Sequence, residues 1–128
     1  MNGVIALDFD ETYNTVPDMY DEIINVFQSW GYKVILATYR HKTIDYDPLF
    51  GRLEAQRVSV YCTDGKAKKK YMEDLGINVN IWIDDNPRSV LEDSAWKHDS
   101  PELHAWREEQ KQKLLDMEAK YERSLKIA

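Results

Sequence analysis

Acidic side chains follow two short apolar runs, and their types and spacing suit the binding of a cation. Asp8 and Asp10 come directly after Val4–Leu7, and Asp84 and Asp85 follow a second apolar run later in the chain. Carboxylates brought close together repel one another, so four of them at one place need a cation between them. Oxygen ligands favour a hard divalent ion, and Mg²⁺ fits because it takes one or two carboxylates together with water and phosphate oxygens. The sequence therefore predicts a magnesium site where the two acidic pairs meet.

Four short segments have the composition of buried parallel strands, because they are apolar, rich in β-branched residues and mostly followed at once by polar residues. They are Gly3–Leu7, Lys33–Thr38, Val58–Cys62 and Val79–Ile83. Segments with a helical spacing of apolar residues separate them, at Asp18–Trp30, Asp47–Gln56 and Lys66–Leu75. This alternation predicts an α/β fold with a mainly parallel sheet and right-handed crossovers. Ligands of such sheets bind at the carboxyl ends of the strands, which is where the acids lie.

The last part of the chain has a different character. Residues 101–128 contain six acids and six bases, so the formal net charge of −6 belongs to the first hundred residues. This tail is rich in good helix formers, and Ser100 followed by Pro101 is typical of a helix start. We expect one helix of roughly 24 residues. The predicted organisation is a core over residues 1–98 and an amphipathic helical extension over residues 99–128.

Composition excludes several classes of protein. A net charge of −6 and a pI of about 5.0 are unsuited to a general coat for nucleic acid or to an anionic membrane surface. One cysteine, Cys62, allows no intrachain disulfide and favours a reducing compartment. No apolar run has the length of a transmembrane helix, and the N-terminus lacks the basic start of a signal peptide. We therefore expect a soluble, cytoplasmic protein.

The acidic pairs resemble two motifs of the haloacid dehalogenase superfamily of phosphatases and phosphotransferases. The family's first motif is a hydrophobic strand followed by Asp-x-Asp-x-Thr, which Asp8, Asp10 and Thr12 match. Its fourth motif is a strand that ends in paired acids, which Asp84 and Asp85 match. The resemblance covers about residues 3–90, and within the superfamily the chain looks most like small members from phages and bacteria.

The other two motifs are weaker when taken alone. Thr38, at the end of its strand, matches the second motif. The third is a lysine near the start of the helix before the last core strand; the resemblance favours Lys68 and leaves Lys66 as the second choice, while Lys69 and Lys70 are expected to face solvent. The residue after the second acid of the first motif is often Gly in the family, whereas Glu11 here adds a charge at the mouth of the site.

The resemblance implies a three-layer, Rossmann-like α/β/α core and phosphoryl transfer through an aspartyl-phosphate. Asp8 would be the nucleophile and Asp10 the general acid and base. Mg²⁺ would be held by Asp8, by the main-chain carbonyl of Asp10, by Asp84, and by Asp85 directly or through water. Thr38 and the lysine would neutralise charge on the phosphoryl oxygens.

The chain has no room for the cap domain that many members of this superfamily insert after the first motif or after the third strand. The gaps at those places are a few residues long. An uncapped site suits a macromolecular or extended phosphoester, or a site closed by another subunit. We expect Thr12, Tyr13, Tyr39 and Arg40 to contact the substrate, because Arg suits a second phosphate and Tyr can stack on a base, although ordinary loop residues have the same composition. His41 is expected to be a surface residue.

Three classes of function remain open from the sequence. The first is a Mg²⁺-dependent phosphatase for a phosphomonoester, with a nucleotide or a nucleic-acid end among the candidate substrates. The second is a binding module that captures a phosphorylated or nucleotide ligand without turnover. The third is a two-component receiver domain, which is disfavoured because receivers pair their acids at the first strand and lack a closing Asp-Asp pair.

The tail predicts a homodimer. Side chains on one face of the helix recur every three or four residues, and all of them are apolar except Gln110, which is tolerable at an interface: they are Leu103, Trp106, Gln110, Leu114, Met117, Tyr121 and Leu125. The alternatives are packing of this face on its own core or pairing with a second copy, and twofold pairing is the commonest arrangement of soluble oligomers. Light scattering on the full chain is expected to give a dimer, and on a chain that ends at Asp99 a monomer. A monomeric full-length chain at tens of micromolar would contradict the prediction.

Overall fold

A computed structural model of the chain describes residues 2–94 and 101–127, without the side chains of residues 101–104, 107 and 124–127. The chain divides into two compact units, Met1–Ala95 and Trp96–Ala128, and each is described by itself. The predicted boundary after residue 98 and the predicted helix cap Ser100 fall outside the described residues. No described helix is long and apolar enough to cross a membrane.

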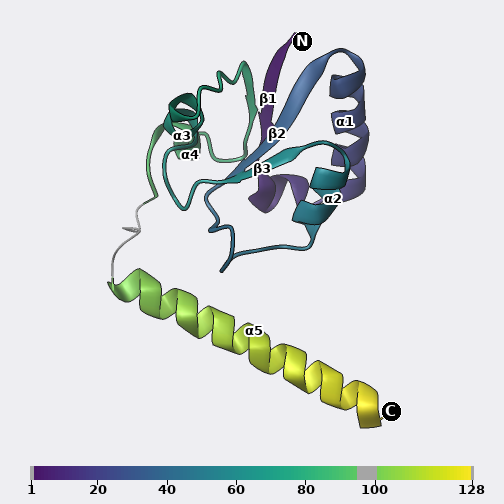
Figure 1. The fold of residues 1–128 in the computed structure, drawn as a ribbon, viewed down its shortest axis with the longest axis vertical. Coiled ribbons are helices and arrows are strands. Elements are labelled where there is room, and N and C mark those ends of the chain that lie inside the picture. Colours follow the sequence, from purple (N-terminus) through teal and green to yellow (C-terminus); the bar gives the residue numbers. More distant parts are fainter. Residues whose placement is uncertain (1, 95–100, 128) are drawn as a thin grey trace. The chain divides into compact units, whose positions relative to one another are not determined.

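The described part of the first unit is built on a four-stranded sheet in which every pair of neighbours is parallel (Figure 1). The strands are β1 (Gly3–Leu7), β2 (Tyr32–Thr38), β3 (Ser59–Cys62) and β4 (Ile81–Ile83), in the order β3-β2-β1-β4. The predicted α/β fold with a parallel sheet is confirmed. β4 is shorter than predicted; just before it, the main-chain N–H of Asn80 donates to the carbonyl of Val4 and the side-chain Oδ1 of Asn80 accepts the N–H of Val4, each at 2.8 Å.

The connecting helices lie close to their predicted places, with ends that differ by a few residues. They are α1 (Pro17–Ser29), α2 (Leu49–Ala55) and α3 (Lys68–Asp74). Two further elements were not predicted: the π-helical turn η1 (Phe9–Tyr13) and the short helix α4 (Arg88–Leu91). Both follow strands that end in acids, so each places further side chains beside the predicted site.

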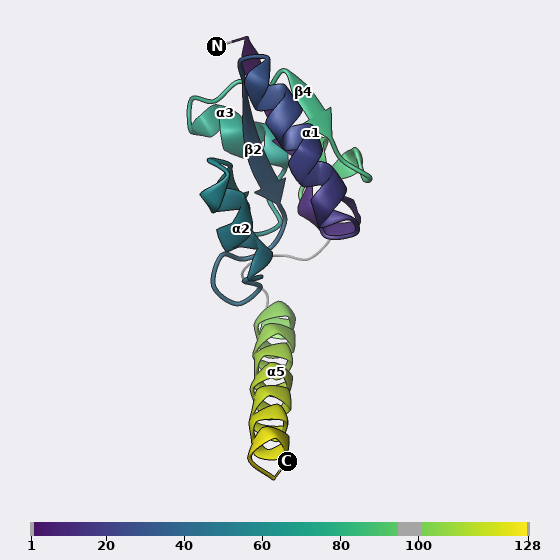
Figure 2. The ribbon, with the colours of Figure 1, turned by 90° about the vertical axis from the view of Figure 1, so that its right-hand side faces the viewer.

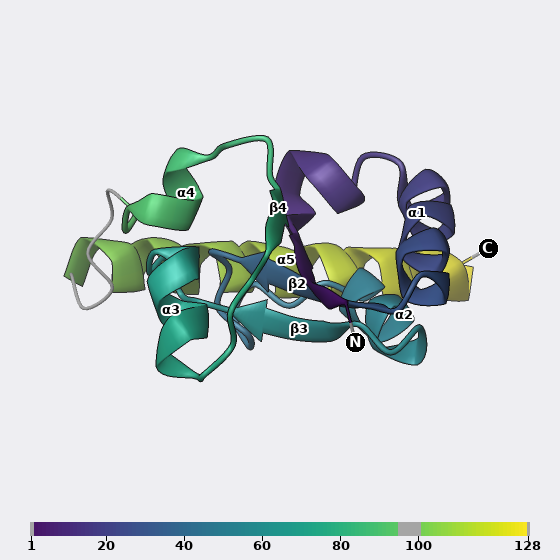
Figure 3. The ribbon, with the colours of Figure 1, turned by 90° about the horizontal axis from the view of Figure 1, so that it is seen from above.

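Two apolar layers hold the helices against the sheet. Figure 3 shows α1 and α2 on one side of the strands and α3 and α4 on the other, and Figure 2 shows α1 and α2 from their own side. Along β2, Val34 and Leu36 pack toward α1 and α2, while Ile35 packs on Met72 of α3. This alternation follows from the two-residue period of a strand, and it explains why the buried strands are apolar on both faces.

The strand order creates the crevice for a ligand. From β1 the chain moves outward through β2 to β3, and it then returns to place β4 on the other side of β1. In open α/β sheets, the point where the order reverses leaves a crevice at the carboxyl ends of the two strands concerned. Here those strands are β1 and β4, the two that end in acids.

The described residues of the second unit form one helix, α5 (Pro101–Ile127), close to the length predicted for the tail. Leu114, Met117 and Tyr121, which belong to the predicted apolar face, have exposed side chains. The side chains of Leu103 and Leu125 lie outside the description.

Two glycines allow a matched test of this backbone. Gly31 follows α1 with φ of 86°, in the left-handed region, whereas Gly51 lies inside α2, where an added Cβ would meet only ordinary contact. Gly31→Ala is expected to lower the free energy of unfolding by about 1–2 kcal/mol, because L-residues are strained at that φ. Gly51→Ala is expected to raise it by about 1 kcal/mol through helix propensity. Denaturant melts of both variants measure the two signs, and equal signs would contradict the assigned conformations.

Candidate active site

The register of the sheet brings the two acidic pairs together. Leu7 of β1 lies opposite Ile83 of β4, and the main-chain N–H of Asp8 donates to the carbonyl of Ile83 at 2.9 Å. Asp8 and Asp84 therefore leave adjacent strands at the same level. Both carboxylates are buried, with side chains 7% and 3% exposed. Burial of two acids this close requires a positive group between them.

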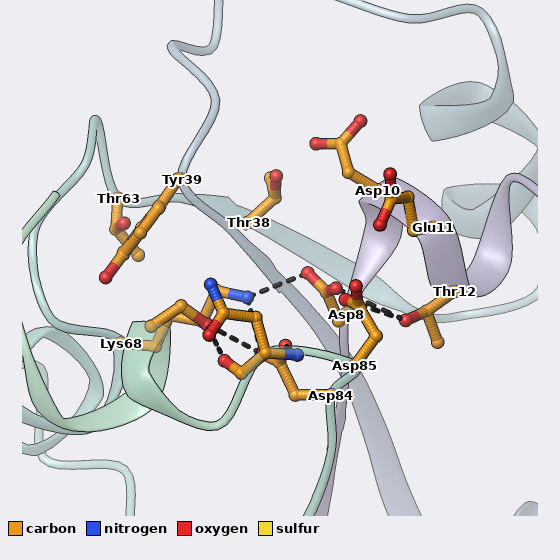
Figure 4. A network of polar contacts seen from close by, with 12 residues as sticks. Asp8, Asp10, Glu11, Thr12, Thr38, Tyr39, Thr63, Lys68, Asp84 and Asp85 are labelled. Atoms are coloured by element: carbon orange, nitrogen blue, oxygen red, sulfur yellow. Dashed lines mark hydrogen bonds and ion pairs between the residues drawn. The ribbon is translucent and has the colours of Figure 1, made fainter.

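That positive group is Lys68. Its Nζ lies 2.7 Å from Oδ1 of Asp8 and 2.6 Å from Oδ2 of Asp84, and its side chain is 3% exposed (Figure 4). Lys66, the second choice from the sequence, is exposed, as are Lys69 and Lys70. The structure thus places Lys68 among the acids and leaves the other lysines of the cluster outside. The ring of Tyr39 covers its ammonium group, with 5.5 Å from Nζ to the ring centroid.

The start of α3 explains why Lys68 is directed inward. The side chain of Asp93 accepts the main-chain N–H of Ala67 at 2.7 Å, and α3 begins at the next residue. The neighbouring residue Glu92 accepts a hydrogen bond from the hydroxyl of Tyr39 through its main-chain carbonyl. The segment after α4 therefore fixes both the lysine and the ring that covers it. Sequence reasoning missed this segment because Asp93 lies far from Ala67 along the chain.

The turn η1 returns a hydroxyl to the acids. The Thr12 hydroxyl lies 3.2 Å from Oδ2 of Asp8 and 3.4 Å from Oδ1 of Asp85. The turn requires φ of 57° at Glu11. This is the position at which the haloacid dehalogenase superfamily, whose first motif this segment resembles, often has Gly. The main-chain N–H of Glu11 donates to Oδ1 of Asn14 at 2.9 Å, which supports the strained residue from within the turn.

Asp8, Asp84 and Asp85 form a group that could hold a metal ion. Each offers a carboxylate oxygen, and these oxygens all lie within 4.8 Å of one another. An all-oxygen donor set of this kind fits a hard cation such as Mg²⁺. The group opens into a cleft of about 470 Å³, which is lined by Asp8, Asp10, Glu11, Asn14, Thr15, Tyr39, Lys68, Asp84, Asp85, Asn86 and Ser89. Ser89, which sequence reasoning missed, donates to Oδ2 of Asp84 at 3.0 Å.

The electrostatics of the group favour the uptake of positive charge. Burial raises the pKa of Asp8 from 3.8 to about 7, and its hydrogen bond with Asp85 acts in the same direction, although the charge of Lys68 opposes both. The hydrogen bond from Asp8 lowers the pKa of the exposed Asp85. Lys68 alone therefore does not fully compensate the negative charge of the Asp8 carboxylate, and a proton or a metal ion can supply the missing positive charge.

Asp10 does not join the three other acids, although its side chain lines the cleft. Arg40 donates to it from Nη2 at 2.7 Å and from Nε at 3.1 and 3.2 Å. The same guanidinium donates to the main-chain carbonyl of Asp45 at 3.0 Å and lies over the ring of Phe9, 4.9 Å from its centroid. The predicted convergence of four carboxylates is thus corrected to three, because Arg40 satisfies the fourth.

Two of the residues predicted to contact the substrate, Tyr13 and Thr12, do not line the cleft. Tyr13 is fully buried and donates to Asp21 on α1 at 2.6 Å, because η1 turns this side chain into the core beside Phe9. Thr12 is 3% exposed and its hydroxyl is engaged with acids, so it positions them rather than facing the cleft. Tyr39 does line the cleft, whereas Arg40 does not line it and contacts one of its lining residues, Asp10.

Three other side chains from the sequence analysis have structural partners. Thr38 is fully buried at the end of β2, and its hydroxyl accepts the main-chain N–H of Arg40 at 3.3 Å, so it is not among the residues that line the cleft. His41 accepts main-chain N–H groups of its own loop through Nδ1. Cys62 is partly buried against the core, and burial raises the pKa of its thiol.

Comparisons of the chain with family models, with curated proteins and with solved structures gave no significant match. Support for a function of this chain therefore comes from the geometry of the site and from the motifs in the sequence.

The raised pKa of Asp8 predicts a pH dependence of stability. The folded state keeps the Asp8 proton between pH 3.8 and about 7, whereas the unfolded chain loses it near 3.8. Stability contributed by this group is therefore fully present below pH 3.8 and is lost as the pH rises to about 7. Asp8→Asn is expected to remove this slope and to leave the metal-free protein at least as stable as the wild type at pH 8. Thermal melts with a chelator measure it, and parallel pH profiles would contradict the assignment.

Proposed function

We propose that this chain is a Mg²⁺-dependent phosphohydrolase of the haloacid dehalogenase type that cleaves a phosphomonoester through an aspartyl-phosphate. The observation that carries the proposal is the buried arrangement of Asp8, Lys68 and Asp84, with Asp85 beside them, at the base of a cleft. This arrangement presents a carboxylate nucleophile, a fixed positive charge and a set of cation ligands to one reacting group.

Asp8 is the nucleophile in this proposal. One of its carboxylate oxygens attacks phosphorus in line, which forms the Asp8 O–P bond and breaks the bond from phosphorus to the alcohol oxygen. Water then attacks the aspartyl-phosphate, so that inorganic phosphate leaves and the carboxylate of Asp8 is restored. The hydrogen bonds from Thr12 and Lys68 keep the side chain of Asp8 in one orientation for both steps.

Asp10 protonates the alcohol oxygen as it leaves and takes a proton from the attacking water. In the structure the carboxylate of Asp10 is paired with Arg40. Both oxygens of that carboxylate accept from the guanidinium, so transfer of a proton between Asp10 and the leaving oxygen requires the pair to separate. Opening of this pair is therefore a part of the proposed cycle.

Charge stabilisation falls to Lys68 and to the proposed metal ligands. The ammonium of Lys68 lies beside the nucleophile and would neutralise charge that develops on the phosphoryl oxygens. Asp84 and Asp85, with Asp8 and the carbonyl of Asp10, would hold Mg²⁺, which supplies further neutralisation of the phosphoryl group when bound. The hydroxyl oxygen of Thr38 accepts the N–H of Arg40, so its own O–H would remain available to donate to a phosphoryl oxygen.

The first prediction from this proposal concerns turnover. The wild type is expected to release inorganic phosphate from a panel of phosphomonoesters when Mg²⁺ is present, and Asp8→Asn is expected to abolish the release while the protein stays folded. Asp74→Asn, at the exposed end of α3, removes the same charge away from the cleft and serves as the control. Phosphate release by Asp8→Asn at the wild-type rate, or the lack of a beryllofluoride adduct on wild-type Asp8, would contradict the mechanism.

The second prediction concerns the metal. A ligand that binds only the folded state stabilises it, by about 2.7 kcal/mol at about 100 times its Kd. Mg²⁺ is therefore expected to raise the melting temperature of the wild type, and the rise is expected to be smaller in Asp84→Asn and Asp85→Asn. Calorimetric titration measures the binding directly. Equal effects of Mg²⁺ on the wild type and on both variants would place the ion elsewhere.

A further inference from the structure

The walls of the cleft carry much more negative than positive charge. Of its eleven lining residues five are acids, namely Asp8, Asp10, Glu11, Asp84 and Asp85, and among the described residues Lys68 is the one cation in the lining. The other lining residues with polar side chains are neutral. A divalent ion on Asp8, Asp84 and Asp85 would offset only part of this charge.

The positive groups near these acids are already engaged. The ammonium of Lys68 binds Asp8 and Asp84, at 2.7 and 2.6 Å. The guanidinium of Arg40 binds Asp10 through two nitrogens and the carbonyl of Asp45 through the third. A second anionic group on the substrate would therefore find no uncommitted cation among the described residues of the cleft.

The cleft also has two levels that separate the parts of an ester. Asp8, Lys68 and the carboxylate of Asp84 form its buried floor, which is where a phosphoryl group would be attacked. Glu11, Thr15 and Asn86 are exposed and form its rim. The alcohol part of an ester that places phosphorus on the floor has to lie against this rim.

Glu11 is the acidic residue of the rim that the proposed chemistry does not use. The turn η1 fixes its main chain at φ of 57°, with its N–H on Asn14, and its carboxyl lies beside that of Asp85 (Figure 4). The side chain is exposed and lines the cleft, so the alcohol part of an ester held on the floor would pass close to it. A carboxylate at that position attracts a cation and repels an anion at short range.

We propose, on the basis of the function proposed above, that the cleft selects small phosphomonoesters whose alcohol part carries a positive charge, the phosphates of amino alcohols, and that Glu11 sets this preference. The same charges disfavour a nucleic-acid end or a nucleoside polyphosphate, whose further phosphates would lie at the acidic rim. The proposal thus argues against the nucleic-acid end that the sequence leaves among the candidate substrates.

Three esters of equal length test the preference. They are 2-aminoethyl phosphate, 2-hydroxyethyl phosphate and phosphoglycolate, whose outer groups are cationic, neutral and anionic. The wild type is expected to show kcat/KM in that order, with the cationic ester favoured over the anionic one by about tenfold or more, as expected for one close charge pair. Glu11→Gln is expected to reduce the ratio by about tenfold, and Glu54→Gln, an exposed acid on α2, is expected to leave it unchanged.

A binding experiment separates failure of this inference from failure of the proposed function. 2-Aminoethylphosphonate and 3-phosphonopropionate carry the same outer charges but have no alcohol to lose, so calorimetry with Mg²⁺ measures their affinity without turnover. If the esters are hydrolysed with a kcat/KM that does not depend on the outer charge, the role of Glu11 is overturned and the proposed phosphohydrolase activity is supported. The opposite result is tighter binding of the cationic phosphonate, weakened in Glu11→Gln, without hydrolysis of any ester. It would support the charge preference and overturn the proposed phosphohydrolase activity. Equal affinities for the two phosphonates, or an unchanged ratio in Glu11→Gln, would overturn the preference itself.

Discussion

The contact between the ammonium of Lys68 and the buried carboxylates of Asp8 and Asp84 is the interaction on which the rest of the site depends. An acid buried alone would be driven to the neutral form, and two facing acids would separate. The lysine allows both to stay at the ends of β1 and β4, where the reversal of strand order leaves a crevice. Two features around it hold that lysine in place: the side chain of Asp93 at the start of α3, and the ring of Tyr39 over its charge.

The lysine provides less charge than the acids require. Asp8 keeps a pKa of about 7, in spite of Lys68, because burial dominates. The site therefore carries negative charge that Lys68 does not compensate. This makes it a candidate for metal binding and catalysis rather than a structural ion pair. The charge of Asp10, by contrast, is compensated by its ion pair with Arg40, outside the group of three acids.

The main features of the fold could be predicted because they follow from local patterns. Short β-branched runs gave the strands, and acids directly after two of them gave the edge of the sheet where the site lies. The orientation of single side chains could not be predicted in the same way. Tyr13 points into the core because it is the last residue of the turn η1, and Lys68 rather than Lys66 points inward because Asp93, distant in sequence, fixes the start of α3. The pairing of Asp10 with Arg40 likewise depends on the conformation of the loop after β2, which the spacing of apolar residues in the sequence does not predict.

The separation of the paired residues along the chain has a consequence for the order of folding. Lys68 and Asp84 are 16 residues apart, whereas Asp8 and Lys68 are 60 residues apart. Closing the longer loop costs more conformational entropy, and contacts of large sequence separation slow the folding of a domain. During synthesis Asp8 also leaves the ribosome long before its lysine does. The first strand is thus followed by an acid whose charge is uncompensated until the second half of the domain has been made. In a nascent chain that ends before Lys68, burial of Asp8 is therefore energetically unfavourable.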